Sequence, residues 1–595
     1  MRNIRKKRRR KRKNMKRKAN EKKKEINKGI TLIALVITII VLIILAGVSI
    51  NVTIGQNGLI TRAKQAKGDM ETAANEEEEQ LAKLVNELES NEIAKINKNE
   101  PNPPKLAQGM SPIKFIDPTE ETKGDVLETV QTDSRWYDYD EKKWANAQTE
   151  DGSMWVWIPR YAYRVNEETQ TFDVVFLMGD TDNYYDEEGN LQTAKRCTRE
   201  GEAVDTTTGY TIHPAFTDET AINFRNGGWD KEVTGIWVAK FEAGYASGNN
   251  AAEVKASSVN YSEETAFVRA VERGQTADGT EDARNWLDGI YGETTTAIKY
   301  PVFQPTTYSM NYINHNDAYN VARTLTESGN IYGLTTSTDS HLMKNSEWGA
   351  VAYLSQSKYG LNGTDIAINN INLNSGGSAR TIAEGKSGVD SVYAVTGCTT
   401  GTNNAGEKVA TIANVNSTTG NNASDGVYTW DQLNGTKASS SGTIYGIYDL
   451  SGGYWEKTAS YVANGNGNLK SYGSSIAYDG NTLKTISTKY TMVYPYDSST
   501  DNTGITNNDT NLNTASTNNW KANTLIYGDA VRETSTAGTG STSWYGDYSY
   551  FPGLSGPFSL RGGNAWGGSN AGLFSFSRSN GGSSYHNGFR AVLVV

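Results

Sequence analysis

Cysteine, proline and histidine are scarce in this chain of 595 residues, which has 2 Cys, 12 Pro and 4 His. Cys197 and Cys398 could form one bridge at most, so a disulfide framework and a four-cysteine zinc site are excluded; the two thiols either pair or stay free. The histidines show no H-x-x-H or H-x-x-x-H spacing of the kind that favours zinc or iron ligation: His213, His315, His341 and His586. No G-x-S-x-G elbow and no P-loop is present.

Glycine and tyrosine are abundant, with 59 and 33 residues, and 37% of the chain is hydrophobic. Many Gly, Asn, Thr and Tyr with little Pro indicate a loop-rich body with much β structure and enough apolar residues for a core.

Charge is distributed unevenly along the chain. Residues 1–28 hold 17 of the 58 Lys and Arg and only two Glu, while the chain as a whole has a net charge of −9. The remainder is therefore strongly acidic, and the chain is a basic arm joined to an acidic body.

An uncharged run of 21 residues, Ile30–Ile50, follows the basic arm directly. As a helix it would be about 31 Å long, enough to cross a bilayer. The positive-inside rule then places the N-terminus in the cytoplasm and the rest outside. The alternative for KKRRRKRK is a nucleic-acid arm, but the adjacent span and anionic lipid headgroups account for the charge without nucleic acid.

The start of this run, KGITLI, resembles the leader of type IV prepilins and pseudopilins. The resemblance implies cleavage by a prepilin peptidase between Gly29 and Ile30. The family has a Glu five residues after the cut, where this chain has Ala34, and that departure counts against assembly into a pilus.

The sequence predicts five parts. They are a basic leader (1–29), a membrane helix (30–54), an amphipathic helix (55–97), a PNPP-containing linker (98–112) and a body (113–595) with insertions at about 360–440 and 460–540. The amphipathic helix has apolar residues at three-four spacing. It is either a stalk, with self-association through its stripe, or a helix that lies against its own domain.

Four elements of the body are predicted from pattern. Met154–Pro159 and Gly235–Glu242 are predicted strands. Asn314–Glu327 is a predicted helix with Ala318, Val321, Ala322 and Leu325 on one face, and Asn345–Gln356 is a predicted helix capped by its own first residue.

Four segments of the body resemble, in this order, the formylglycine-generating-enzyme and sulfatase-modifying-factor family. They are NSEWGAVAYLS (345–355), YGIYDLSGGYWEKTAS (445–460), SLRGGNAW (559–566) and GFR (588–590). The resemblance spans about residues 150–595 and implies a C-type-lectin-like fold. Together with the N-terminal helices it predicts the α+β class: a transmembrane and stalk helix followed by a large loop-rich domain.

The motifs supply candidate framework residues. Trp348, Trp455 and Phe589 are predicted core residues. Arg561 and Arg590 are candidates for buried ion pairs with Asp449 or Glu456 that would fix the last strand.

The resemblance covers oxidases, iron-dependent synthases and binding proteins, so the site has to decide between them. The oxidases use a cysteine pair with copper near the RGG segment, but residues 399–595 contain no cysteine. We therefore expect a binding protein and no enzyme; a formylglycine-type oxidase is the weakest alternative. For a binding protein the resemblance implies calcium, which family members often carry, although no EF-hand spacing is present.

The segment Gly562–Gly588 has the composition of a binding surface. Of its 27 residues, 19 are Gly, Ser, Asn or Tyr, as in antibody paratopes. It is similar to the variable segment of proteins diversified by retroelements, which lies between RGG-like and GFR-like motifs; the alternative is an ordinary loop-rich C-terminus. The predicted ligand-facing residues are Asn564, Trp566, Ser569, Asn570, Ser575, Ser577, Ser579, Tyr585 and His586. We expect Phe574 and Phe576 in the core, with Ser575 and Ser577 on the surface.

The resulting prediction is an adhesin- or receptor-like protein on a bacterial cell membrane that binds an extracellular protein or glycan. The alternative is a minor pilin or pseudopilin subunit, with the same membrane and peptidase as partners.

Overall fold

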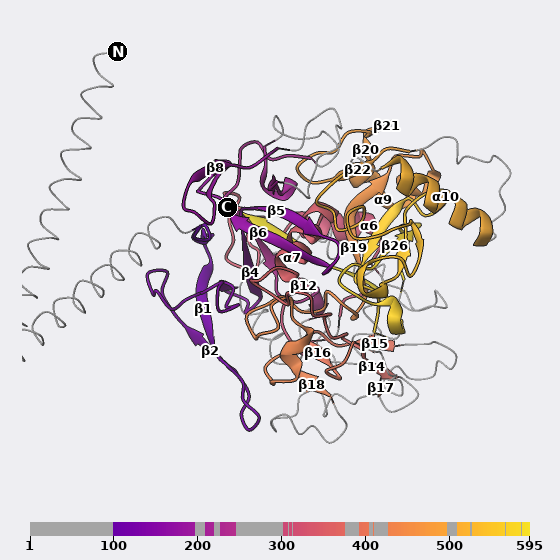
Figure 1. Ribbon diagram of the computed structural model, residues 1–595. Coiled ribbons are helices and arrows are strands. Elements are labelled where there is room, and N and C mark those ends of the chain that lie inside the picture. The colour runs from indigo at the N-terminus through magenta and orange to yellow at the C-terminus, as the bar shows by residue number, and fades with distance from the viewer. Residues whose placement is uncertain are drawn as a thin grey trace, which may run out of the picture. The chain divides into compact units, whose positions relative to one another are not determined.

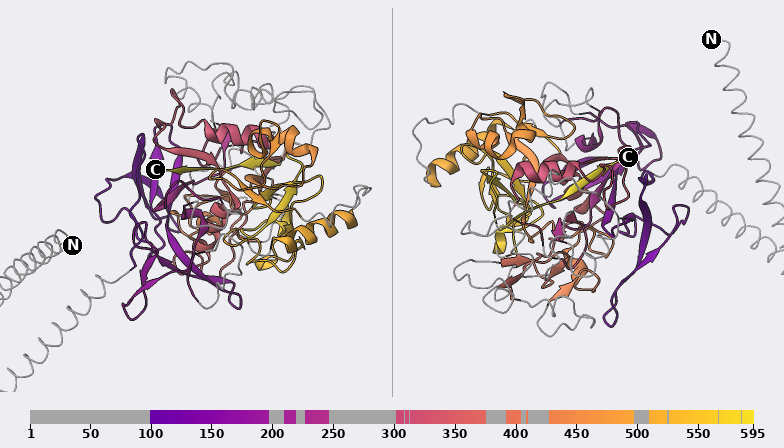
Figure 2. Two further views of the ribbon diagram at one scale, coloured as in Figure 1. Left: turned by 90° about the horizontal axis from the view of Figure 1, so that it is seen from above. Right: turned by 180° about the vertical axis from the view of Figure 1, so that it is seen from behind.

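The computed structural model describes residues 99–196, 209–218, 227–245, 301–307, 309–311, 313–374, 392–403, 408–409, 427–496, 509–523, 526–565, 567–584 and 586–595. All of these fall within one of the two compact units of the chain, Asn97–Val595. Figures 1 and 2 show this body in three views.

The last strand of the chain lies inside the first sheet. This sheet has seven strands in the order β13 (Asp339–Leu342), β28 (Ala591–Val594), β10 (Gly235–Ala239), β4 (Met154–Pro159), β3 (Asn146–Thr149), β1 (Met110–Ile116) and β2 (Asp125–Glu128). Every neighbouring pair is antiparallel. The C-terminal strand is thus held between two strands that lie far from it in sequence.

Side chains of the first sheet alternate between two hydrophobic clusters. Trp155, Trp157 and Trp237 enter one cluster, whereas Val156, Ile158 and their neighbours enter the other. β28 follows the same alternation, since Leu593 belongs to the first cluster and Val592 to the second. The strands β4, β10 and β28 are therefore buried on both faces, which explains the continuous apolar run at the end of the chain.

The second sheet also has seven strands. Its order is β22 (Met492–Tyr494), β19 (Trp455–Val462), β25 (Phe558–Arg561), β26 (Phe576–Ser579), β24 (Ser549–Tyr550) and β23 (Thr539–Gly540), with β27 (Asn587–Phe589) beside β19. β19 is antiparallel to β25 and parallel to β22 and β27. In Figure 1, α9 (Gly467–Ala477) lies beside α6 (His315–Arg323), and the two helices are in contact.

Shorter strands complete the described body. The sheet β6-β5-β9 consists of Thr171–Phe176, Tyr161–Asn166 and Thr211–Ile212, and β15-β14-β17 of Val392–Ala394, Ile371–Asn374 and Lys408–Val409. Four strand pairs remain: β7 (Asn183–Tyr185) with β8 (Leu191–Thr193), β11 (Gly244–Tyr245) with β12 (Pro301–Val302), β16 (Cys398–Thr399) with β18 (Tyr428–Thr429), and β20 (Tyr478–Asp479) with β21 (Thr482–Leu483).

Two of the predicted helices form, each with shifted ends. α6 spans His315–Arg323 with Asn314 as its N-cap, and the four predicted apolar residues are buried. It ends before the predicted Glu327 because the N–H of Thr324 turns back to the carbonyl of Val321. α7 spans Asn345–Ser355, but its N-cap is Lys344, whose N–H donates to the Glu347 carboxylate. The prediction that Asn345 caps α7 is wrong.

The strand predictions also hold in part. β4 has the predicted bounds of Met154–Pro159, whereas β10 ends at Ala239, three residues before the predicted Glu242. The carboxylate of Glu242 turns inward instead and accepts the N–H of Tyr454.

The predicted α+β class with an N-terminal transmembrane and stalk helix is wrong. The described residues are mainly strands, with four α-helices, α6, α7, α9 and α10 (Asp509–Ala522). Strands prevail because the body is rich in Thr, Tyr, Val and Trp, and because its Gly and Asn interrupt helices. Among the described helices none has the length and apolar character to cross a bilayer. The segments predicted as membrane helix and stalk, 30–54 and 55–97, lie outside the described residues.

Candidate functional site

The register of the second sheet gathers the polar C-terminal segment on one face. Trp455 of β19 pairs with Asn587 of β27, and Leu560 of β25 pairs with Ser577 of β26. Ser579 lies two residues beyond Ser577, so it shares this face. Residues from β25, β26 and β27, near the end of the chain, thus meet on one surface with β19, which lies about 100 residues earlier.

This surface is hollowed, with a volume of about 410 Å³. The hollow is of a size that small ligands occupy in proteins. Its walls come from β19, β25, β26, β27 and the loop between β26 and β27: Trp455, Leu560, Ser577, Arg578, Ser579, Asn580, Gly582, Ser583, Ser584, His586 and Asn587. We call this site the C-terminal hollow.

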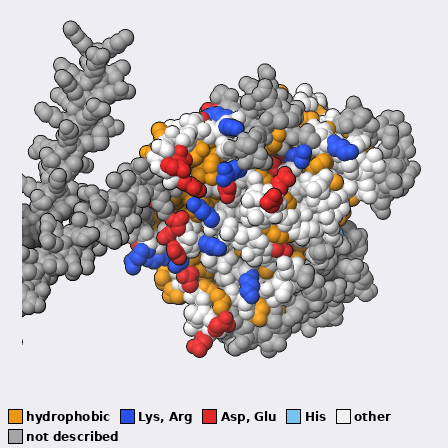
Figure 3. Space-filling view, viewed as in Figure 1, with side chains coloured by type: hydrophobic (Ala, Val, Ile, Leu, Met, Phe, Trp, Pro, Cys, Tyr) orange, Lys and Arg blue, Asp and Glu red, His pale blue; other side chains and the backbone are white. Residues whose placement is uncertain are grey.

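The C-terminal hollow offers a neutral polar wall. Burial, with Lys457 nearby, lowers the pKa of His586 to about 4, so its imidazole is uncharged at neutral pH. Arg578 borders the hollow, but its guanidinium lies over the ring of Tyr550, 4.4 Å from the centroid. In Figure 3, charged side chains gather toward β1 and β2, and fewer lie on the side of α9 and α10.

The buried side chain of Lys457 contacts the loop between β26 and β27. Lys457 Nζ donates to the carbonyl oxygen of Gly582 at 3.1 Å and lies 3.3 Å from Nδ1 of His315. The backbone N–H of His315 donates to the carbonyl of Gly581 at 2.9 Å. Burial lowers the pKa of Lys457 from 10.5 to about 7. The loop between β26 and β27 is therefore held by hydrogen bonds from β19 and α6.

The predicted ion pair between Arg590 and Glu456 is confirmed. Arg590 donates to both carboxylate oxygens of Glu456, at 2.6 and 3.0 Å, and both side chains are buried. Its remaining donors reach the carbonyls of Ala239 and Tyr448 at 2.7 and 2.8 Å. This guanidinium joins β10 of the first sheet to β19 of the second, directly behind the hollow.

Two further carboxylates, of Asp449 and Glu242, lie behind the hollow. Burial raises the pKa of Asp449, Glu456 and Glu242, and Arg590 opposes the rise at the first two. Asp449 accepts from the Nδ2 of Asn369 and the N–H of Gly397. Asp449 is thus buried, but it bonds to Asn369 and Gly397 instead of forming the predicted ion pair with Arg561 or Arg590.

Arg561 makes a different contact from the predicted ion pair. It is buried, yet it donates to the backbone carbonyls of Asp529 and Ala530, both at 2.9 Å, and lies over the ring of Trp348. The prediction that Arg561 pairs with Asp449 or Glu456 is wrong, because β25 presents it to the segment 529–530 instead. Burial lowers the pKa of Arg561 to about 10.

Two of the three predicted core residues are buried, and the third is not. Trp348 and Phe589 are fully buried, whereas Trp455 is only partly buried and forms a wall of the hollow. The prediction of Trp455 as a core residue is wrong. Trp455 is the first residue of β19, and this end of the strand reaches the surface although the rest of the strand is buried. Phe574 and Phe576 are buried and Ser577 is partly exposed, as predicted, but Ser575 is buried and its hydroxyl donates to the carbonyl of Asn570.

The structure brings together three of the nine predicted ligand-facing residues, Ser577, Ser579 and His586. Asn570 is exposed but does not border the hollow, and Asn564 is buried, with no described partner for its Oδ1. Trp566 and Tyr585 lie outside the described residues, as do Gly29 and Ile30 of the predicted cleavage site. Of Ser569 only the backbone, in the short helix Gly568–Asn570, is described.

Sequence reasoning missed several residues of the wall: Leu560, Asn580, Ser583, Ser584 and Asn587. The signal was present for four of them, since they lie in the same polar run or next to the GFR motif. Only the pairing of β27 with β19 reveals that Asn587 stands beside Trp455.

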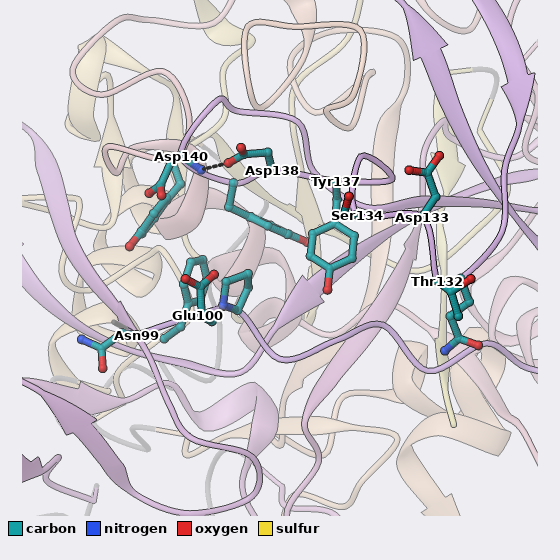
Figure 4. A pocket seen from close by; sticks show the side chains of 13 residues that line it. Asn99, Glu100, Thr132, Asp133, Ser134, Tyr137, Asp138 and Asp140 are labelled. Atoms are coloured by element: carbon teal, nitrogen blue, oxygen red, sulfur yellow. Dashed lines mark hydrogen bonds between the residues drawn. The ribbon is translucent and has the colours of Figure 1, made fainter. Parts of the chain in front are cut away.

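A second hollow of about 430 Å³ lies beside Asp133 and Tyr137 (Figure 4). Its carboxylates already have partners. Asp133 accepts from Lys114 Nζ at 2.7 Å, and Asp138 accepts the N–H of Asp140. The acidic wall of this hollow is therefore satisfied from within the protein, and it is a weaker candidate.

The described residues contain no group of three or more His, Cys, Asp or Glu that could hold a metal ion. The calcium suggested by the resemblance thus finds no carboxylate cage in this part of the chain. Cys398 is buried and free, and burial raises the pKa of its thiol; Cys197 lies outside the described residues.

Comparison with protein-family models and with curated proteins finds no match for this chain.

Proposed function

We propose that this protein binds an extracellular ligand through the C-terminal hollow and acts as a surface-displayed binding protein without catalysis. One observation carries the proposal. Strand register places side chains from β19, β25, β26 and β27 on one hollowed face. A buried ion pair fixes that face from behind.

The chemistry of the wall supports binding. Hydroxyls, carboxamides, a neutral imidazole and one indole form adaptable contacts with little loss of rotamer freedom. A rigid sheet that carries a polar loop is the arrangement in which binding residues are commonly presented.

The proposal places the body outside a bacterial membrane, with the N-terminus in the cytoplasm. This part rests on the basic arm and the apolar run of residues 1–50. Protease treatment of intact cells checks it: we expect the body to be released and a tag at the N-terminus to be protected.

Diversification of the segment Gly562–Gly588 remains a separate prediction. A near-copy of its coding sequence beside a reverse-transcriptase gene would support it. A lack of such a repeat would leave the binding proposal unchanged.

A pair of substitutions tests the binding site. Fluorescently labelled full-length protein is applied to arrays of extracellular proteins and glycans, and the affinity for any captured ligand is measured. Ser583 in the C-terminal hollow and Thr132 in the second hollow are both exposed, so both accept Lys. We expect Ser583→Lys to weaken binding by about tenfold or more and Thr132→Lys to bind as the wild type does. Wild-type affinity in Ser583→Lys would contradict the proposal.

A further inference from the structure

The wall of the C-terminal hollow suits a polar ligand. Leu560 contributes the one aliphatic side chain among the residues that border it, and it is 5% exposed. The rest of the wall is Ser, Asn, Gly, His, Arg and Trp. An apolar peptide side chain would gain little here, because it would leave these hydroxyls and carboxamides without water or a partner.

The same wall disfavours a charged ligand. No Asp, Glu or Lys borders the hollow. Arg578 is the one charged residue that borders it, and its guanidinium lies over the ring of Tyr550, 4.4 Å from the centroid. A cation would find no counter-charge in this wall, and an anion would have to draw Arg578 away from the ring of Tyr550.

One acceptor in the wall points to a ligand that donates hydrogen bonds. Asn587 is 5% exposed, and its Oδ1 has no hydrogen-bond partner among the described residues. A buried acceptor without a partner costs free energy, and since this oxygen is itself covered, a ligand hydroxyl recovers that cost by drawing the Asn587 side chain toward the hollow.

An aromatic platform stands beside this acceptor. Trp455 is partly exposed, and its backbone N–H donates to the carbonyl of His586 at 3.0 Å, which fixes it beside the loop. Its ring meets Tyr548 edge-on at 6.3 Å. An indole next to a hydroxyl acceptor matches a molecule that has one C–H face and a rim of hydroxyls.

We infer that the C-terminal hollow binds a neutral saccharide unit, with its ring against Trp455 and a hydroxyl donating to Asn587. This inference rests on the binding function proposed above. Ser577, Ser579 and Ser583 border the same space; the more exposed Ser577 and Ser583 complete the polar contacts, while the Ser579 hydroxyl accepts the N–H of Gly581.

Titration with free sugars tests the inference. Full-length protein, kept in a detergent without sugar groups, is titrated with neutral hexoses, N-acetylhexosamines and deoxyhexoses and with the matching uronic acids. Saturation-transfer NMR and calorimetry report binding. We expect at least one neutral sugar to bind and the uronic acids to bind more weakly.

Variants of the platform and the acceptor sharpen the test. Trp455→Ala and Asn587→Leu should each weaken sugar binding by about tenfold, whereas Trp455→Phe, which keeps a ring, and Thr132→Lys should retain it. The thermal midpoint of each variant shows that it is folded.

Two outcomes would overturn the inference. One is that no neutral sugar binds; the other is that sugar binding does not change in Trp455→Ala and Asn587→Leu. If Ser583→Lys still blocks capture of a protein ligand in either case, the binding function stands and the saccharide assignment falls. If Ser583→Lys has no effect on any ligand, the proposed function falls as well.

Discussion

Among single residues, Arg590 should contribute strongly to the free energy of unfolding. Arg590→Met leaves the buried carboxylate of Glu456 without its partner, and breaking such a pair typically costs about 3–5 kcal/mol. We expect a loss of this size in the free energy of unfolding, measured with urea. Arg164→Met is the control, because its pair with Asp173 is 38% and 46% exposed and should matter by less than about 1 kcal/mol. Equal effects of the two variants would contradict the assigned role of Arg590.

Lys457 gives a pH dependence with a definite sign. Its pKa is about 7 in the folded protein and 10.5 ordinarily, so between these values the unfolded chain binds more protons. Stability should therefore rise with pH from about 7 to 10, by at most about 1.4 kcal/mol per pH unit from this group. Urea unfolding at several pH values measures the slope. Lys457→Met should lose this increment, and an unchanged slope in the variant would show that the amine is protonated when buried.

At the scale of elements, the backbone conformation of the loop between β26 and β27 depends on Gly581. It has a φ of +94°, and a Cβ there would lie 2.6 Å from the ring of Phe558. Gly581→Ala should destabilise the protein by about 2 kcal/mol or more and also weaken ligand binding, because the loop forms the hollow. Gly480→Ala is the matched control: it has a φ of +59° with nothing within 4 Å of the added Cβ, so only the backbone cost of about 1–2 kcal/mol applies. Thermal unfolding and binding compare them, and a Gly581→Ala variant no weaker in binding than Gly480→Ala would refute the loop's role.

Elements with a local pattern were predictable, and those that depend on pairing were not. The apolar spacing of α6 and the run of β4 lie within single segments, so sequence located both. The wall of the hollow depends on β27 lying parallel to β19, more than 120 residues away, and no local signal specifies such a register. The motifs predicted an ion pair for both Arg590 and Arg561. The pair of Arg590 with Glu456 is present, whereas Arg561 donates to the carbonyls of residues 529–530, a contact that depends on how distant segments pack.

At the scale of the whole molecule, Lys240 connects segments that are far apart in the sequence. Its Nζ donates to Asn146 Oδ1 and to the carbonyls of Ile444 and Gly446, at 2.7–3.0 Å. It also lies within 6 Å of the ring centroids of Phe115, Trp430 and Tyr448. Lys240→Met leaves three buried acceptors unpaired, so we expect a loss of about 3 kcal/mol or more and faster amide exchange in residues 427–450. Lys358→Met, at an exposed position, is the control, and similar exchange in both variants would contradict this account.

Amide hydrogen exchange of the full-length protein, with and without its captured ligand, tests the central claim most directly. If the C-terminal hollow is the binding site, ligand should slow exchange in residues 577–587 and around Trp455, and leave residues 131–140 of the second hollow unchanged. Protection confined to residues 131–140, with none in 577–587, would contradict it.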